Sequence, residues 1–185
     1  MSVQDTDILL YLTGAPSDGG DQTDPDVSLG NYRSSSEIAS GGANTLFDDV
    51  LSQESALGDI EYRCYCIKNI NVVDDLLNPK IWIETDTGNN EDNISFAVEV
   101  PAGGDQDGNA QTITNESSSP VVGAGNVSAW SDSISKATGT GVDQGGHDAN
   151  LDAGEIVFVW VRRTISAGAS AVSTENLTIK IEGDN

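Results

Sequence analysis

Two groups of acidic residues have the types and spacing that could bind a divalent cation. In the first, Asp105, Asp107 and Asn109 place side-chain oxygens at alternate positions of one segment. Oxygen ligands of this kind are the ones that Ca²⁺ prefers. A complete EF-hand loop is not present, because Gly108 is misplaced within it. The segment is therefore interpreted as an ordinary acidic turn, with a calcium site as the alternative.

The second acidic group lies further along the chain, at Asp143, Asp148, Asp152 and Glu155. It carries the same two interpretations, an acidic loop or a calcium site. His147, the one histidine of the sequence, lies within this group in a glycine-rich stretch with no nucleophile motif beside it. It is interpreted as an exposed loop side chain.

Sequence motifs for catalysis are absent. The sequence contains no nucleophile elbow, no zinc-protease motif and no phosphate-binding loop. Cys64 and Cys66 lie two residues apart, so they share one face of a strand and are interpreted as small core residues rather than as a redox pair. We therefore expect no enzyme activity and no cofactor, calcium excepted.

Arg162 and Arg163 make up two of the eight Lys and Arg residues. Adjacent side chains at a strand end point to opposite faces of a sheet. Two interpretations stand: ion pairs with carboxylates of the same chain, or contacts with an acidic neighbouring subunit.

The charge of the chain excludes several classes of partner. It has 30 Asp and Glu against 8 Lys and Arg, a net charge of −22, and a pI of about 4.1. Nucleic acid and anionic membranes both attract positive surfaces, so neither is an expected partner. We also expect no signal peptide and no membrane-spanning segment. A saline setting, in which salt screens the carboxylates, is one explanation of the acidic excess, and a generic acidic protein is the other.

The hydrophobic pattern predicts a protein made of β-strands. Apolar and polar residues alternate with the period of a half-buried strand over residues 60–67, 80–85, 94–100 and 177–182. Residues 156–161 are apolar on both faces, which predicts a central strand. Residues 46–57 are the one helix-like stretch. The fold class is therefore an all-β antiparallel sandwich, jelly-roll-like.

The first thirty residues are expected to form an extended arm. Residues 8–13 are apolar, and residues 14–30 are rich in Gly, Asp, Pro and Ser, a composition that does not fold alone. The expected organisation is an arm over residues 1–30 and a β-sandwich domain over residues 31–185. A strand in the arm could add to the sheet edge of a neighbour. The candidate interface residues are Ile8, Leu9, Leu10, Tyr11, Leu12, Arg162 and Arg163.

Several short segments carry a resemblance to a known family. They are residues 46–50 (LFDDV), 58–64 (GDIEYRC), 68–69 (KN), 80–83 (KIWI), 111–116 (QTITNE), 159–164 (VWVRRT), 167–169 (AGA) and 177–184. In this order and spacing they resemble virion structural proteins of tailed phages, over roughly residues 27–184. The arm and the connector over residues 131–154 depart from that pattern. The resemblance implies a virion building block and no chemistry.

We therefore expect a capsid decoration (cement) protein that binds the outer surface of the head and stabilises contacts between capsomers. The implied partners are the major capsid protein and copies of this chain, as a homotrimer. A negative protein is repelled by the packaged genome, which favours the exterior. The alternatives are a tail or baseplate component and a host-surface carbohydrate-binding module, for which Trp130 is the candidate contact.

Overall fold

The computed structural model describes residues 2–39, 41, 45–86, 92–103, 105–170 and 177–184, and it confirms an all-β chain. The strands are β1 (Ile8–Ala15), β2 (Gly30–Glu37), β3 (Asp59–Asn69), β4 (Leu77–Asp86), β5 (Asp92–Glu99), β6 (Ala110–Thr112), β7 (Thr140–Gly141), β8 (Ile156–Ile165) and β9 (Leu177–Asp184). The helices are α1 (Ser52–Leu57) and the 3₁₀ turns η1 (Asp5–Asp7), η2 (Pro25–Val27) and η3 (Lys136–Thr138). No helix among these is long and apolar enough to cross a bilayer.

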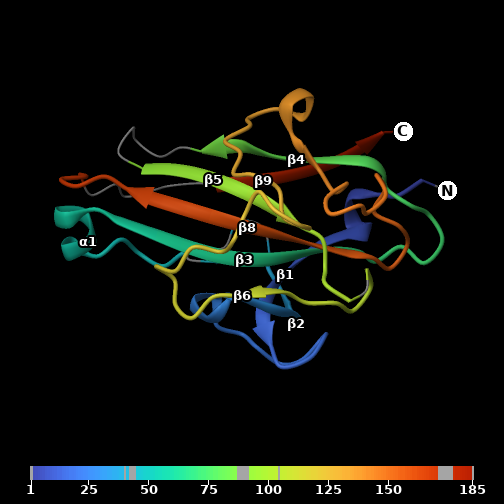
Figure 1. Cartoon of the computed structure of the whole chain (residues 1–185), viewed down its shortest axis with the longest axis horizontal. Helices are drawn as coiled ribbons and strands as arrows, with labels where there is room; N and C mark the ends of the chain where they lie inside the picture. Colours follow the sequence, from blue (N-terminus) through green and yellow to red (C-terminus); the bar gives the residue numbers. More distant parts are fainter. Residues whose placement is uncertain are drawn as a thin grey trace.

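The strands form two antiparallel sheets that lie against each other (Figure 1). The larger sheet has the order β5-β8-β3-β1-β2-β6, and the smaller has the order β7-β4-β9. β8 and β3 form the longest ladder, which pairs Ile156 with Lys68 at one end and Ile165 with Asp59 at the other. These two long strands connect the two ends of the molecule.

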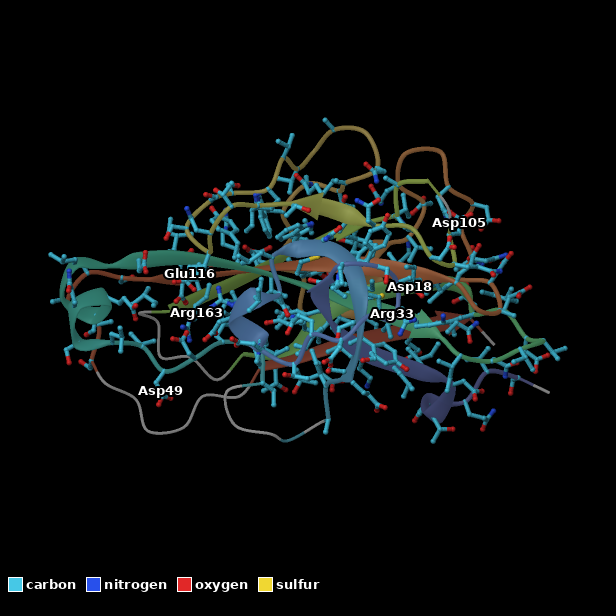
Figure 2. The ribbon with its side chains drawn as sticks, turned by 90° about the horizontal axis from the view of Figure 1, so that it is seen from below. Asp18, Arg33, Asp49, Asp105, Glu116 and Arg163 are labelled. Atoms are coloured by element: carbon cyan, nitrogen blue, oxygen red, sulfur yellow. The ribbon has the colours of Figure 1, made fainter. Side chains whose placement is uncertain are left out.

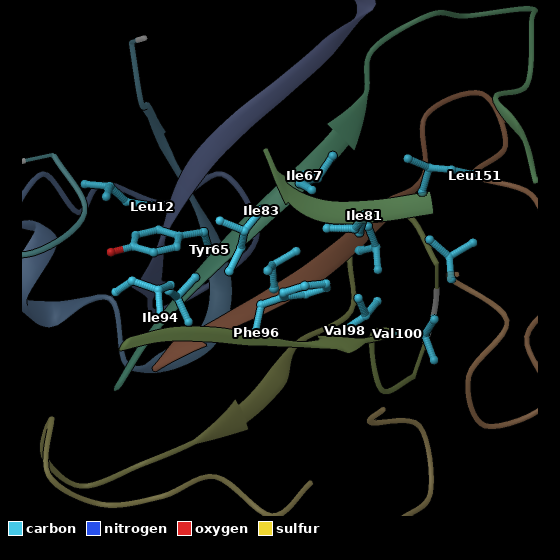
Figure 3. Packing of buried hydrophobic residues seen from close by; sticks show 14 of the residues in the cluster. Leu12, Tyr65, Ile67, Ile81, Ile83, Ile94, Phe96, Val98, Val100 and Leu151 are labelled. Carbon is cyan, nitrogen blue, oxygen red and sulfur yellow. The ribbon is translucent and has the colours of Figure 1, made fainter. Parts of the chain in front are cut away.

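The main hydrophobic core lies between the two sheets (Figure 3). β4 contributes Ile81 and Ile83, which face Phe96 and Val98 of β5. β8 contributes the alternate residues of its central stretch, and Tyr65 of β3 closes the layer. The alternation predicted for residues 80–85 and 94–100 is confirmed, because alternate side chains share the core face. The half-burial predicted for residues 94–100 is wrong, because Ala97 and Glu99 on the opposite face are buried as well.

The other face of the larger sheet is also buried. Phe158 and Trp160 lie on this face, where Val127 and Ile113 of the connecting segments cover them. All residues from Ile156 to Val161 are therefore buried, which confirms the central strand predicted there. Burial on both faces explains why a single strand reads as a continuous apolar run.

The N-terminal segment requires a correction. β1 is not part of a free arm, because it lies inside the larger sheet between β3 and β2. Residues from Ile8 to Leu12 pair one by one with residues from Asn69 to Tyr65, and the Leu10 carbonyl accepts from the Ile38 amide on the other side. Ile8, Leu9, Leu10, Tyr11 and Leu12 all pair with β3 on one edge, and from Leu10 onward the other edge is hydrogen-bonded to the β2 side. Leu10, Tyr11 and Leu12 therefore offer no free strand edge to a neighbour.

The polar segment after β1 folds back onto the same sheet. Asp18 forms an ion pair with Arg33 of β2 at 2.7 Å, and the Asp24 side chain accepts from the Asp26 amide at the start of η2. The Ser28 carbonyl then accepts from the Cys64 amide of β3. These contacts hold in place a composition that would not fold alone.

Candidate functional site

Two charged clusters, at opposite ends of β8, hold several of the residues singled out by their chemistry (Figure 2). The interior arginine cluster consists of Asp26, Phe47, Asp48, Glu61, Arg63, Glu116 and Arg163. The carboxylate–histidine cluster consists of Asp105, His147 and Glu155, with Asp148 and Asp152 beside them.

Arg163 is buried in the interior arginine cluster rather than displayed to a neighbour. Its side chain is 8% exposed, and its Nε donates to Oε2 of Glu61 at 2.5 Å. Its Nη1 donates to the Asp48 carbonyl at 3.0 Å. Glu61 lies directly opposite Arg163 in the β3–β8 ladder, so the sheet register itself forms this pair. Burial raises the pKa of the Glu61 carboxyl, and the hydrogen bond from Arg163 opposes that rise.

Arg63 joins the cluster from the same face of β3. Its side chain is fully buried, and its Nη2 lies 2.6 Å from Oε2 of Glu116 and 3.2 Å from Oδ1 of Asp26. A buried guanidinium requires paired carboxylates, because an unpaired charge is costly to remove from water. Arg63 thereby connects β3 to two loops that are distant in the sequence.

Phe47 and Asp48 close the cluster from the segment before α1. The Phe47 ring lies under both guanidinium groups, 4.7 Å from that of Arg163 and 5.6 Å from that of Arg63. Oδ1 of Asp48 lies 3.6 Å and 3.9 Å from the Nη2 atoms of Arg163 and Arg63. The Tyr65 hydroxyl donates to the carbonyl of Leu46 and holds this segment in place. The arrangement is a structural link between five segments, and its arginines are already paired.

Arg162 points to the opposite face, as predicted for adjacent residues at a strand end. Its Nε donates to the Ser95 hydroxyl at 2.9 Å, and its guanidinium lies 4.8 Å from the ring centre of Trp130. The Trp130 ring also packs against the Tyr62 ring, with 5.8 Å between the two ring centres. Both arginines therefore have partners in their own chain. Arg163 is buried against carboxylates, as the ion-pair interpretation predicts, whereas Arg162 contacts a hydroxyl group and an aromatic ring.

Cys64 and Cys66 are free thiols on the buried outer face of β3. Both are completely buried, and burial raises the pKa of each thiol. They are core residues, as their spacing predicts.

The carboxylate–histidine cluster forms where the β5–β6 loop meets the connection between β7 and β8. The ligand atoms of Asp105, His147 and Glu155 all lie within 4.8 Å of one another. The His147 side chain is only 9% exposed, so its interpretation as an exposed loop side chain is wrong. A surface depression beside it is lined by Pro101 and Asn126.

The electrostatics of this cluster are dominated by negative charge. Burial raises the pKa of Glu155, and the neighbouring carboxylates of Asp152 and Asp105 raise it further. Burial also raises the pKa of Asp152, and Asp75 and Asp148 contribute to that rise. His147 opposes both shifts.

The structure brings together only some residues of the two groups predicted as calcium ligands. Asp105 comes from the first group and Glu155 from the second, and the structure brings them together with His147. Asp107 and Asp143 do not belong to any metal-binding group found among the residues that the structure describes. Glu116, which follows the first group, instead binds Arg63 at the far end of the molecule.

Glu99 is a buried acid that the sequence analysis missed. It is 2% exposed, and its carboxylate accepts from Nε1 of Trp160 at 2.6 Å and from the Gln111 amide at 2.8 Å. Burial raises the pKa of its carboxyl. The sequence feature that could have identified this buried acid is the position of Glu99 between Val98 and Val100 in a predicted strand.

No protein-family model, curated protein or solved structure matches this chain. Its function is therefore argued from its own residues and contacts.

Proposed function

We propose that this chain is a virion structural protein of a tailed virus and acts as a capsid decoration protein. The observation that carries the proposal is the composition of the interior arginine cluster. Four of the segments that resemble virion structural proteins meet there. They contribute Phe47 and Asp48, Glu61 and Arg63, Glu116, and Arg163. Segments that match a family by chance would not be expected to meet in one buried cluster. Their meeting there supports the idea that this chain and the family have a structural core in common.

One further segment of the resemblance, residues 68–69, has a structural role, and so does the first residue of segment 58–64. The Asn69 side chain donates to the carbonyls of Asp74, Leu151 and Asp152, which fixes the loop before β8. Gly58 has a φ of +79°, and a Cβ there would lie 3.0 Å from the backbone of Ile165. Each segment thus holds the fold, which suits a building block rather than a reaction centre.

The distribution of charge supports a position on the outside of the particle. Within the described residues, five of the eight Lys and Arg side chains form ion pairs with carboxylates of the same chain. The surplus of acid, a net charge of −22, has no such partners to neutralise it. A protein of this charge is repelled by packaged DNA, whereas it can bind a neutral or basic capsid exterior. Its proposed partners are the major capsid protein and its own copies in a homotrimer, since many weak contacts together give avidity.

The structure gives no support to the carbohydrate-binding alternative. A sugar-stacking tryptophan needs a free ring face, and the Trp130 ring packs against Arg162 and Tyr62.

The deciding experiment is to locate the chain in intact virions by affinity labelling and density. We expect hundreds of copies on the outer surface of the head. A handful of copies at the tail would replace decoration by a tail or baseplate role. Absence from purified particles would overturn the virion assignment altogether.

A matched binding test uses capsids stripped of the chain. Adding back the full-length protein should restore their resistance to heat, and an excess of bare DNA should not compete for the protein. Competition by DNA would contradict the exterior position. Truncation of residues 1–26 is not a clean test, because it would remove β1 from the sheet.

A further inference from the structure

The imidazole of His147 is oriented toward carboxylates without a hydrogen bond to them. Its Nδ1 lies 2.9 Å from the Asp148 carbonyl oxygen, and its Nε2 lies 3.6 Å from Oδ1 of Asp105. The second distance exceeds the hydrogen-bond range. Within the described residues, no hydrogen bond to Nε2 is found, although the side chain is only 9% exposed.

This geometry identifies the ring nitrogen that donates to the backbone. A carbonyl oxygen only accepts hydrogen bonds, so the Nδ1 facing it is the N–H donor. Nε2 is then the nitrogen that faces the Asp105 carboxylate. A proton on Nε2 or a metal ion between the two groups would satisfy this contact. A backbone carbonyl that orients the far nitrogen is also the usual support of a metal-binding histidine.

The three side chains come from segments whose backbones are held in place. The Asp105 carbonyl accepts from the Ile156 amide at 2.7 Å, and the His147 amide donates to the Gln144 carbonyl at 2.9 Å. Oε2 of Glu155 accepts from the Asp152 amide at 2.6 Å. The backbone positions of the three ligands are therefore set by the fold before any ion binds, and the half-exposed Asp105 side chain is free to adjust.

We infer that Asp105, His147 and Glu155 bind a divalent transition-metal ion of the Zn²⁺ class. One imidazole nitrogen with two carboxylates is a ligand set that zinc accepts, whereas Ca²⁺ takes oxygen ligands alone. Ligand atoms around a tetrahedral zinc lie roughly 3.5 Å apart, so atoms within 4.8 Å need only small side-chain movements to reach it. The ion would link the β5–β6 turn, the loop around residue 147 and the start of β8.

The first test uses the only histidine of the chain as its own reporter. The full-length protein, labelled with ¹⁵N, is titrated with Zn²⁺ while the imidazole nitrogens are followed by NMR. We expect the Nε2 resonance to shift and to saturate at one equivalent, with Nδ1 still protonated. An imidazole spectrum that is unchanged at saturating Zn²⁺ overturns the site. This readout is needed because a chain with a net charge of −22 also binds cations nonspecifically.

The second test compares variants by calorimetry and by the shift in melting temperature that Zn²⁺ causes. His147→Gln and Asp105→Asn should each weaken the one-equivalent binding by about tenfold or more. Asp107→Asn is the matched control, since this exposed residue lies two positions from Asp105 and outside the site. Equal zinc affinity in His147→Gln and the native chain, or tighter binding of Ca²⁺ than of Zn²⁺, contradicts the inference.

Discussion

Carboxylates crowd together at both ends of β8, but buried cations neutralise them at only one end (Figure 2). At the end near Arg163, two buried guanidinium groups neutralise the acids around them. At the other end, where β8 begins just after Glu155, carboxylates surround a single imidazole, that of His147. The first cluster pairs both of its guanidinium groups with carboxylates, although Oδ1 of Asp48, Nε of Arg63 and Nη2 of Arg163 are buried without a hydrogen bond to any described residue. The second retains an excess of negative charge, so its stability depends on protons or cations taken from the solvent.

The largest expected effect is the loss of Arg163. In Arg163→Met the buried carboxylate of Glu61, whose side chain is 2% exposed, loses its partner. Breaking a buried pair from one side costs about 3–5 kcal/mol of the unfolding free energy. The measurement is the denaturant midpoint at neutral pH.

The control variant also removes the carboxylate of Glu61, which Arg163→Met leaves without its partner. The double variant Glu61→Gln/Arg163→Met should be more stable than Arg163→Met, because no unpaired charge is left inside. If the double variant is less stable by the sum of the two single effects, the two residues do not act as a pair.

The pH dependence of stability should come from the other buried acids. The folded state raises the pKa of Glu155, Asp152 and Glu99, so it binds protons more tightly than the unfolded chain does. Stability from these groups is fully present below their unfolded pKa and is lost as the pH rises through their folded pKa. The unfolding free energy should therefore increase as the pH falls through the folded pKa of these carboxyls toward their unfolded values of about pH 4.

The variant Glu155→Gln sharpens the pH prediction. Its amide oxygen still accepts from the Asp152 amide, so the loop contact is kept while the charge is lost. The increase toward acidic pH should become shallower. If the unfolding free energy of the native chain instead decreases as the pH falls, the ion-paired acids contribute more to the pH dependence than the unpaired ones.

A smaller effect of opposite sign is expected for Asp152→Asn. The change removes one of the like charges around Glu155, so it should raise the melting temperature slightly at neutral pH in the absence of metal. The expected gain is within about 0.5 kcal/mol, the range of ordinary surface substitutions. A clear loss of stability would mean that Asp152 already has a cationic partner.

The smallest effect is expected for an exposed ion pair. Lys180 lies 2.8 Å from Glu84, and their side chains are 43% and 46% exposed. Water screens such a pair, so Lys180→Met should leave the denaturant midpoint unchanged within error. A loss comparable to that of Arg163→Met would remove the distinction between buried and exposed pairs.

The sequence placed Glu61 and Arg63 on one face of a half-buried strand, but it did not predict that this face is buried. The alternation over residues 60–67 places Glu61 and Arg63 on the same face as Tyr65, and that face proved to be buried. The pairing of Glu61 with Arg163 depends on the β3–β8 register, which local patterns do not specify. Glu116 had to be brought from a loop, and nothing near it in the sequence indicates Arg63.

The sequence by itself determined the all-β class, the two-sided burial of β8, the core role of the cysteines and the acidic charge. These properties depend on composition and on the alternation of neighbouring residues, which a strand expresses locally. Only the tertiary structure decided that β1 lies inside the sheet, that Arg163 is buried and that Asp105, His147 and Glu155 meet. The physical reason is that strand order and loop contacts join residues far apart in the chain, and their energies depend on partners that no local pattern specifies.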